Sequence, residues 1–249
     1  MPKYSIAQIK DAYIQKKDWE KQFPVSYFLF RPISFYLTCL IIQVTESAPI
    51  VAWLGFAIAL LGCMSFLFIP YLTVWPGIIL LMIFALLDAV DGNIARVTKS
   101  VTYYGKYLDG MIGILIDGSY CFWLGLGLYN SCGTREFPLF LYGIIIMAAR
   151  IYSSIFEGNY EAFLIQKQKN EGSFQETLNQ NIPSSTYRRH WWYLLFININ
   201  AFNLQLMILA LCAVFHIVNL FLFFFALYYL FRFLVIVVFY IYRAQKNLN

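Results

Sequence analysis

The sequence predicts an all-α integral membrane protein with six transmembrane helices. Of its 249 residues, 61% are hydrophobic and only 12% are charged, and the mean hydropathy is +0.64, which lies outside the usual range of water-soluble domains. Six apolar stretches approach or exceed the about 20 residues that a helix needs to cross a bilayer. These stretches are continuously apolar rather than alternating, which disfavours a β-barrel.

The segment before the first stretch, residues 1–48, is predicted to lie at the membrane surface. Apolar side chains recur at helical spacing among lysines, at Ile6, Ile9, Tyr13 and Ile14. This pattern is typical of an amphipathic interfacial helix. Residues 28–43 are apolar but short and follow a proline, so we expect a second interfacial helix there, with a seventh span as the alternative.

The remaining residues, 49–249, are predicted to form one transmembrane catalytic domain. Its expected spans are 49–69, 74–95, 106–130, 138–157, 191–214 and 217–242. The stretch from about 158 to 190 is rich in Gln, Asn, Ser and Glu. This composition favours a cytoplasmic loop rather than a second domain.

Lysine and arginine residues set the expected orientation of the chain. With six spans, one side of the membrane holds Lys3, Lys10, Lys16, Lys17, Lys21, Arg31, Arg96, Lys99, Lys106, Lys167, Lys169, Arg188, Arg189, Arg243 and Lys246. The opposite side holds Arg135 alone. The positive-inside rule therefore places both termini in the cytoplasm. Basic residues spread over short segments between spans are typical of membrane anchors, and no nucleic-acid motif is present.

Four aspartates fall inside or at the edges of predicted spans: Asp88, Asp91, Asp109 and Asp117. Other acids, Glu20 among them, fall in tails or loops and are expected to be solvated. An ionised carboxylate near the bilayer centre costs about 2.5 to 3.5 kcal/mol even on the lenient insertion scale. The four acids within the apolar runs are therefore the first candidates for a functional site.

Three of these acids are expected to converge near the cytoplasmic face. Asp88 and Asp91 are three residues apart, so they share one helix face. A short turn follows, and an antiparallel hairpin would bring Asp109 level with them. Gathered carboxylate oxygens suit a hard cation such as Mg²⁺, Mn²⁺ or Ca²⁺. The alternative is that each acid caps a helix end or pairs with Arg96 or Lys106.

The sequence around these acids resembles the signature of the CDP-alcohol phosphotransferase family. The segment LLDAVDGNIARVTKSVTYYGKYLD contains Asp88-x2-Asp91-Gly92-x2-Ala95-Arg96-x8-Gly105-x3-Asp109. Seven positions at fixed spacing make a chance match improbable. The resemblance implies that Asp88, Asp91 and Asp109 hold one or two Mg²⁺ or Mn²⁺ ions against the pyrophosphate of a CDP-linked donor.

The same resemblance assigns nucleotide contacts to small residues and one cation, at Gly92, Ala95, Gly105 and Arg96. A missing or short side chain lets cytidine and phosphate approach the helix backbone. Arg96 would pair with an acid or a phosphate, or serve as an interfacial anchor without a ligand.

The chain departs from the family pattern at Gly113, where the family has a fourth Asp that is taken as the general base. The next acid, Asp117, is eight residues past Asp109, too far along an ideal helix to share the same ions. It could act as a displaced base, contact the acceptor, or form an ion pair with Arg150 or Arg232. The ion pair is favoured because intramembrane charges usually pair. Asp109 could then act as the base.

The leading functional prediction is an enzyme that transfers a phospho-alcohol from a CDP-linked donor to a hydroxyl acceptor and releases CMP. The product would be a phospholipid or a lipid-linked glycoconjugate, and Arg150 is a candidate for binding a phosphate on the acceptor. One alternative is a catalytically impaired relative that binds CDP-alcohols or a partner. A transporter is a less favoured alternative. The resemblance also implies an active site on the cytoplasmic side and a homodimer in contact with membrane lipids.

Overall fold

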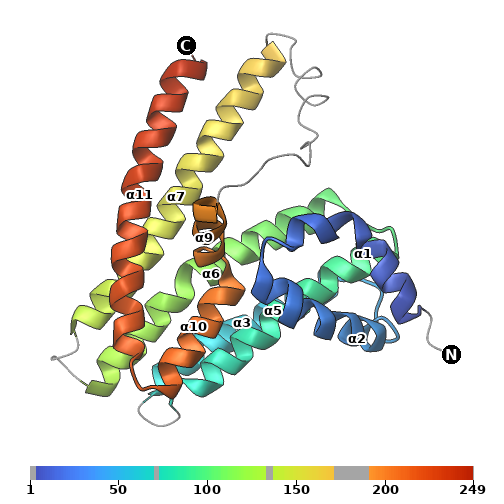
Figure 1. The fold of residues 1–249 in the computed structure, drawn as a ribbon, viewed down its shortest axis with the longest axis horizontal. Helices are drawn as coiled ribbons and strands as arrows, with labels where there is room; N and C mark the ends of the chain where they lie inside the picture. Colours follow the sequence, from blue (N-terminus) through green and yellow to red (C-terminus); the bar gives the residue numbers. More distant parts are fainter. Residues whose placement is uncertain (1–3, 70–72, 133–136, 171–190, 249) are drawn as a thin grey trace.

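The structure of the protein is a computed structural model that describes residues 4–69, 73–132, 137–170 and 191–248. Every regular element in these residues is a helix (Figure 1). Their bounds are α1 Ile6–Glu20, η1 Ser26–Phe30, α2 Arg31–Ile41, α3 Ala48–Ser65, η2 Phe66–Phe68, α5 Trp75–Val97, α6 Tyr103–Cys132, α7 Phe137–Asn170, α9 Trp191–Ile199, α10 Phe202–Val214 and α11 Val218–Leu248. The element η1 is a π-helix and η2 is a 3₁₀-helix.

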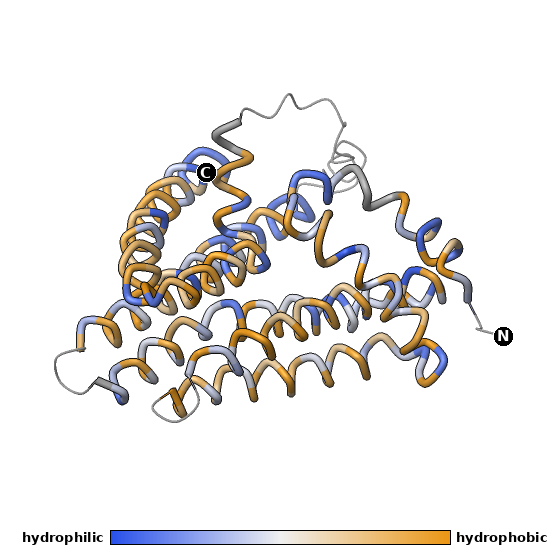
Figure 2. Tube along the Cα trace, turned by 60° about the horizontal axis from the view of Figure 1, so that its bottom comes forward, coloured by the Kyte–Doolittle hydropathy of each residue, from blue (hydrophilic) through white to orange (hydrophobic). Residues whose placement is uncertain are grey.

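The predicted all-α membrane fold is confirmed. Within the described residues, five helices are long and apolar enough to cross a membrane: Ala48–Phe68, Trp75–Val97, Tyr103–Ser131, Phe137–Asn170 and Val218–Leu248. Hydrophobic residues dominate the long helices (Figure 2). Prolines stand in the first turn of α2, α3 and α5, where the missing N–H costs no hydrogen bond.

The expected span 191–214 differs in the structure, because it is divided into the short helices α9 and α10. Ala201 has an extended backbone, with φ −71° and ψ 121°, and separates the two helices. The asparagine amides beside the break each donate a hydrogen bond to a carbonyl four residues earlier. Asn200 Nδ2 donates to Phe196 O at 2.7 Å, and Asn198 Nδ2 donates to Leu194 O at 2.8 Å. Such side-chain bonds compete with the helical backbone ladder.

The expected cytoplasmic loop begins later than predicted. Residues 158–170 continue helix α7 instead of leaving it, and residues 171–190 lie outside the described residues. The extension packs against the end of α11, where Lys167 Nζ donates to Asn247 O at 3.0 Å and Asn247 Nδ2 donates to Tyr160 OH at 2.7 Å. Figure 1 shows α7 and α11 side by side, projecting beyond the other helices.

The N-terminal helices α1 and α2 pack against one end of α5. Ile9 and Tyr13 are buried against Phe35 of α2, whereas Ile14 is exposed. The apolar face that the sequence assigned to the lipid surface is therefore largely covered by α2 and by the end of α5. The apolar helix Ser26–Ile41 is shorter than the five spans, which fits the predicted interfacial helix better than a seventh span.

Helices α5 and α6 are joined by a tight turn but do not pack closely on each other within the described residues. Lys99 ends α5 in the left-handed conformation, with φ 55°, and Ser100 N donates to Ala95 O at 2.9 Å. This bond closes the helix end in a Schellman-type turn. Helix α3 packs along α5 and also contacts α6. The space left between α5 and α6 is where the candidate site forms.

Candidate active site between two membrane helices

Two cavities lie between α5 and α6, and Asp109 lines both. The acid cavity has a volume of about 340 Å³, and its walls include Asp88, Asp109, Asp117 and Gly113. Phenylalanines from several elements complete it: Phe23, Phe30, Phe84 and Phe202. The cavity thus combines carboxylates with an apolar wall.

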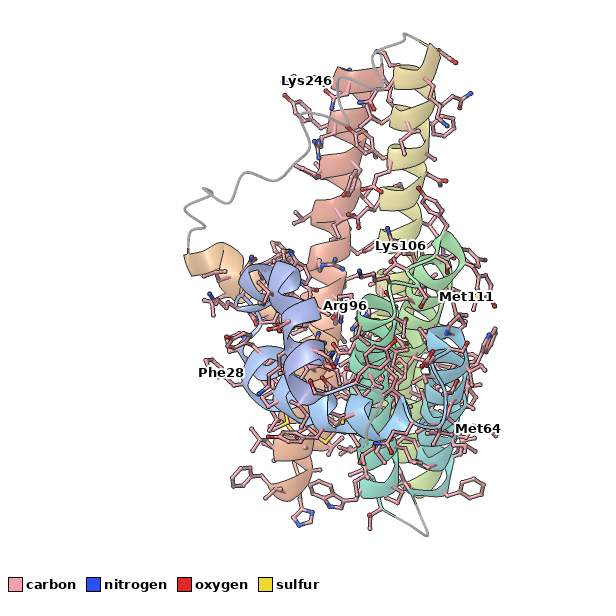
Figure 3. The ribbon with its side chains drawn as sticks, turned by 90° about the vertical axis from the view of Figure 1, so that its right-hand side faces the viewer. Phe28, Met64, Arg96, Lys106, Met111 and Lys246 are labelled. Carbon is pink, nitrogen blue, oxygen red and sulfur yellow. The ribbon has the colours of Figure 1, made fainter. Side chains whose placement is uncertain are left out.

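The second, the motif cavity, gathers most of the positions that carry the predicted signature. It has a volume of about 290 Å³ and is lined by Asp91, Gly92, Ala95, Arg96, Gly105 and Asp109, with residues of α3 and the α5–α6 turn. Asp88 is the one signature residue that lines the acid cavity instead. In Figure 3, Lys106 and Arg96 lie between Lys246 at one end of the molecule and Met64 nearer the opposite end.

Asp109 shares a cavity wall with each of the other two acids, because Asp88 and Asp109 line the acid cavity and Asp91 and Asp109 line the motif cavity. That all three acids meet at one ion stays a prediction. Their side chains are not arranged as a finished metal cage, because no group of three His, Cys, Asp or Glu residues in the described part of the chain is placed to hold an ion. The donor set itself fits a hard divalent cation, since it consists of carboxylate oxygens beside open cavities.

Glycines leave room around these carboxylates. A Cβ atom added to Gly110 or Gly113 would meet no atom within 4 Å, and one added to Gly105 would meet only Thr102 Oγ1, at 3.3 Å. Gly113, where the resemblance leads us to expect a fourth Asp, therefore opens into free space at the level of a Cβ atom.

Asp117 forms an ion pair with Arg150 of α7. The predicted ion pair is therefore present, with Arg150 rather than Arg232 as its partner. Asp117 Oδ1 is buried and has no hydrogen-bond partner among the described residues. Asp117 also lines a third cavity of about 330 Å³, the arginine cavity, together with Arg150, Arg232 and Asn200.

A buried polar network holds Arg150 in place. Arg150 Nη1 donates to Gln205 Oε1 at 2.8 Å and to Tyr229 OH at 2.7 Å, and its guanidinium lies 4.8 Å from the ring centre of Tyr229. Tyr120 OH also donates to Gln205 Oε1, at 2.8 Å. Sequence reasoning missed Gln205 and Tyr229. The sequence signal for this network was Gln205, a lone amide inside an apolar run, because a buried polar side chain needs a hydrogen-bond partner.

A second buried ion pair joins α1 to α2, and it corrects the expectation that Glu20 is solvated. Glu20 is only 3% exposed and pairs with Arg31, which is 7% exposed. Tyr13 OH donates to Glu20 Oε2 at 2.5 Å. Burial, together with this bond to the carboxylate, raises the pKa of Tyr13. Both Glu20 and Arg31 line the acid cavity.

Arg31 reaches the backbone that carries the acids. Its Nη1 donates to Ala89 O at 3.4 Å and to Asn93 Oδ1 at 3.1 Å. Asn93 also accepts a hydrogen bond from Arg96 Nη2 at 2.9 Å. The sequence offered no spacing that connects Arg31 with Asn93, so this contact is visible only in the folded chain.

The fold and this cleft define a membrane protein with a carboxylate-lined site between two of its spans. Residues 48–162 match the sequence model of the family described as CDP-alcohol phosphatidyltransferase. The resemblance inferred from the signature is thereby confirmed over the segment that holds Asp88, Asp91, Asp109, Asp117 and Arg150.

Among individual proteins, the chain is similar to archaetidylinositol phosphate synthase of Pyrococcus horikoshii, with 42% identity over 74 residues. That match covers 30% of this chain and 38% of the relative's length.

Proposed function

We propose that the protein transfers a phospho-alcohol from a CDP-linked donor to a hydroxyl acceptor and releases CMP, in the synthesis of a membrane phospholipid. The observation that carries this proposal is the motif cavity, in which six of the seven signature positions meet. The acceptor oxygen forms a bond to the β-phosphorus of the donor, and the bond from that phosphorus to CMP breaks. The name of the similar synthase describes a lipid product with a phosphorylated head group, which supports head-group transfer here.

The carboxylates of Asp88, Asp91 and Asp109 would hold one or two Mg²⁺ or Mn²⁺ ions. Bound ions would neutralise these acids and stabilise negative charge on the pyrophosphate. In the same cleft, Gly92 and Gly105 leave the backbone open to the nucleotide. The phenylalanines of the acid cavity supply an apolar wall suited to a lipid portion of either substrate.

The arginine cavity is proposed as the place for an anionic group on the acceptor. It adjoins the acid cavity, because Gly113 and Asp117 line both. Arg150 and Arg232 bring two positive charges to it, and Arg232 Nε has no hydrogen-bond partner among the described residues. A phosphate on the acceptor would satisfy this unused donor with a charge-assisted hydrogen bond.

Release of CMP by the purified full chain tests the proposed reaction. CDP-diacylglycerol and soluble CDP-alcohols would be offered with a panel of hydroxyl acceptors, in the presence of Mg²⁺ or Mn²⁺ and then with EDTA. We expect CMP with at least one donor and its loss on chelation. Asp91→Asn and Asp109→Asn should each abolish turnover. Absence of CMP with every donor and acceptor would contradict the proposal.

The glycine at position 113 favours a second candidate function, in which the protein is a family relative that binds CDP-alcohols without turning them over. A missing general base lowers the rate about 10² to 10⁴-fold in typical enzymes, which could leave turnover undetected. Calorimetric titration with CDP-alcohols separates the two functions. Binding without CMP release would favour the binding protein, and binding accompanied by CMP release would favour the transferase.

A further inference from the structure

Asp117 stands between two cavities of opposite charge. The acid cavity presents Asp88 and Asp109, whereas the arginine cavity presents Arg150 and Arg232, and Asp117 lines both. Asp117 pairs with Arg150, while its Oδ1 atom is buried without a hydrogen-bond partner. A carboxylate oxygen left in this way has lost its water without full compensation. In this position the Asp117 carboxylate therefore lacks part of its hydrogen bonding.

Arg150 does not depend on Asp117 for its position. Gln205 and Tyr229 accept hydrogen bonds from its Nη1 atom, and the guanidinium also contacts the Tyr229 ring. If the carboxylate moved away, these contacts would keep the guanidinium facing the cavity. The Arg150 guanidinium is thus held by the helices around it, and the Asp117 carboxylate paired with it can be exchanged for another anion.

The arginine cavity carries more positive than negative charge. Two guanidinium groups line it, and Asp117 is the one carboxylate among its lining residues. Arg232 has no ion-pair partner among the described residues, although its guanidinium lies 5.9 Å from the ring centre of Tyr229. A phosphate monoester carries up to two negative charges and would compensate both arginines, which a single carboxylate does not.

We propose that Asp117 is an internal counter-ion of the arginine cavity, that the phosphate of a phosphorylated acceptor displaces it from Arg150, and that the released carboxylate takes the proton of the acceptor hydroxyl. The second half of this inference rests on the proposed function. The proton moves from the acceptor oxygen to Asp117, that oxygen bonds to the β-phosphorus of the donor, and CMP leaves with the electron pair of the broken bond.

Gly113 is the feature that makes this exchange possible. It lies one turn before Asp117 on α6 and lines the same two cavities. Because a Cβ at Gly113 would meet nothing within 4 Å, no side chain there separates the Asp117 carboxylate from the acid cavity. The space beside Gly113 is thus open to an acid from the next turn, about 6 Å further along the helix axis.

Titration of the purified full chain with inorganic phosphate tests the displacement without any turnover. Asp117→Asn should bind phosphate about tenfold more tightly than the original chain, because the competing carboxylate no longer occupies Arg150. Asp109→Asn removes the same charge from the acid cavity but leaves the ion pair intact, so its phosphate affinity should change much less. In Asp117→Asn with Arg150→Gln, the gain should disappear. This double variant leaves neither partner of the pair charged in the membrane.

Unchanged or weaker phosphate binding in Asp117→Asn would overturn the displacement, and so would an equal gain in Asp109→Asn. These results stand whether or not CDP-alcohols are substrates, so they are independent of the proposed function.

Steady-state kinetics with inositol phosphate and glycerol 3-phosphate as acceptors test the proton transfer. Asp117→Asn should lower kcat about 10² to 10⁴-fold while the KM for the phosphorylated acceptor falls. Adding Gly113→Asp to that variant should restore much of kcat, because the new carboxylate would enter the acid cavity. An unchanged kcat in Asp117→Asn would overturn the proton transfer. A loss that Gly113→Asp fails to restore would assign Asp117 a structural role instead.

Discussion

At the scale of single residues, Arg31 shows how a charge outside the predicted spans shapes the candidate site. It pairs with Glu20 and donates to the backbone of α5 at Ala89, between Asp88 and Asp91 in the sequence. Both charges are buried, so each needs the other to offset its lost hydration. The pair therefore fixes the N-terminal helices against the helix that carries two of the acids.

Arg31→Met is expected to destabilise the protein by about 3–5 kcal/mol, because it leaves the Glu20 carboxylate buried without its cation. The measurement is the denaturant midpoint of the detergent-solubilised protein. The matched control is Glu20→Gln combined with Arg31→Met, which removes both charges and should recover most of the loss. Equal destabilisation of the single and double variants would show that the packing of Arg31 matters rather than its charge.

At the scale of the elements, close backbone approaches at glycines set how α6 packs. A Cβ on Gly125 would come within 2.5 Å of Leu139 O, and one on Gly143 within 2.7 Å of Cys121 O, at the contact between α6 and α7. Gly127 is tighter still, since its added Cβ would lie 1.9 Å from Phe66 O. Small residues let membrane helices approach closely where lipid provides no hydrophobic drive for association.

Gly127→Ala should therefore destabilise the protein by about 1–3 kcal/mol, the usual cost of overpacking. The atom it meets belongs to the backbone of η2 and cannot move aside by a rotamer change. Gly158→Ala is the control, because a Cβ there meets nothing within 4 Å and alanine favours a helix by about 1 kcal/mol. Thermal midpoints in one detergent should fall for the first variant and rise for the second. The same direction for both would contradict the packing argument.

At the scale of the whole molecule, helix length and charge together predict the orientation of the chain in the membrane. Helix α7 has 34 residues, about 51 Å at 1.5 Å per residue, which exceeds a hydrocarbon core of about 30 Å. Its far end and the end of α11 carry Lys167, Lys169 and Lys246. The excess length and the lysines point to the same side, which the positive-inside rule assigns to the cytoplasm.

Cysteine labelling in intact cells tests this orientation. In a chain with its five native cysteines replaced, Lys99→Cys and Lys246→Cys should be protected from an impermeant maleimide, whereas His216→Cys should react. All three positions are exposed, and His216 lies in the turn between α10 and α11. Labelling of Lys246→Cys from outside would reverse the assigned orientation.

The sequence by itself determined the membrane class and most helices, because long apolar runs are local properties of the chain. From fixed spacing it also predicts that Asp88, Asp91 and Asp109 converge. It also placed Asp117 among paired charges, with Arg150 or Arg232 as its candidate partner. Only the tertiary structure decided which arginine it was, since the polar partners Gln205 and Tyr229 come from distant helices. The structure likewise revealed the burial of Glu20 with Arg31, the break before α10 and the continuation of α7. Each depends on contacts between segments far apart in the chain, and no periodicity within one segment encodes them.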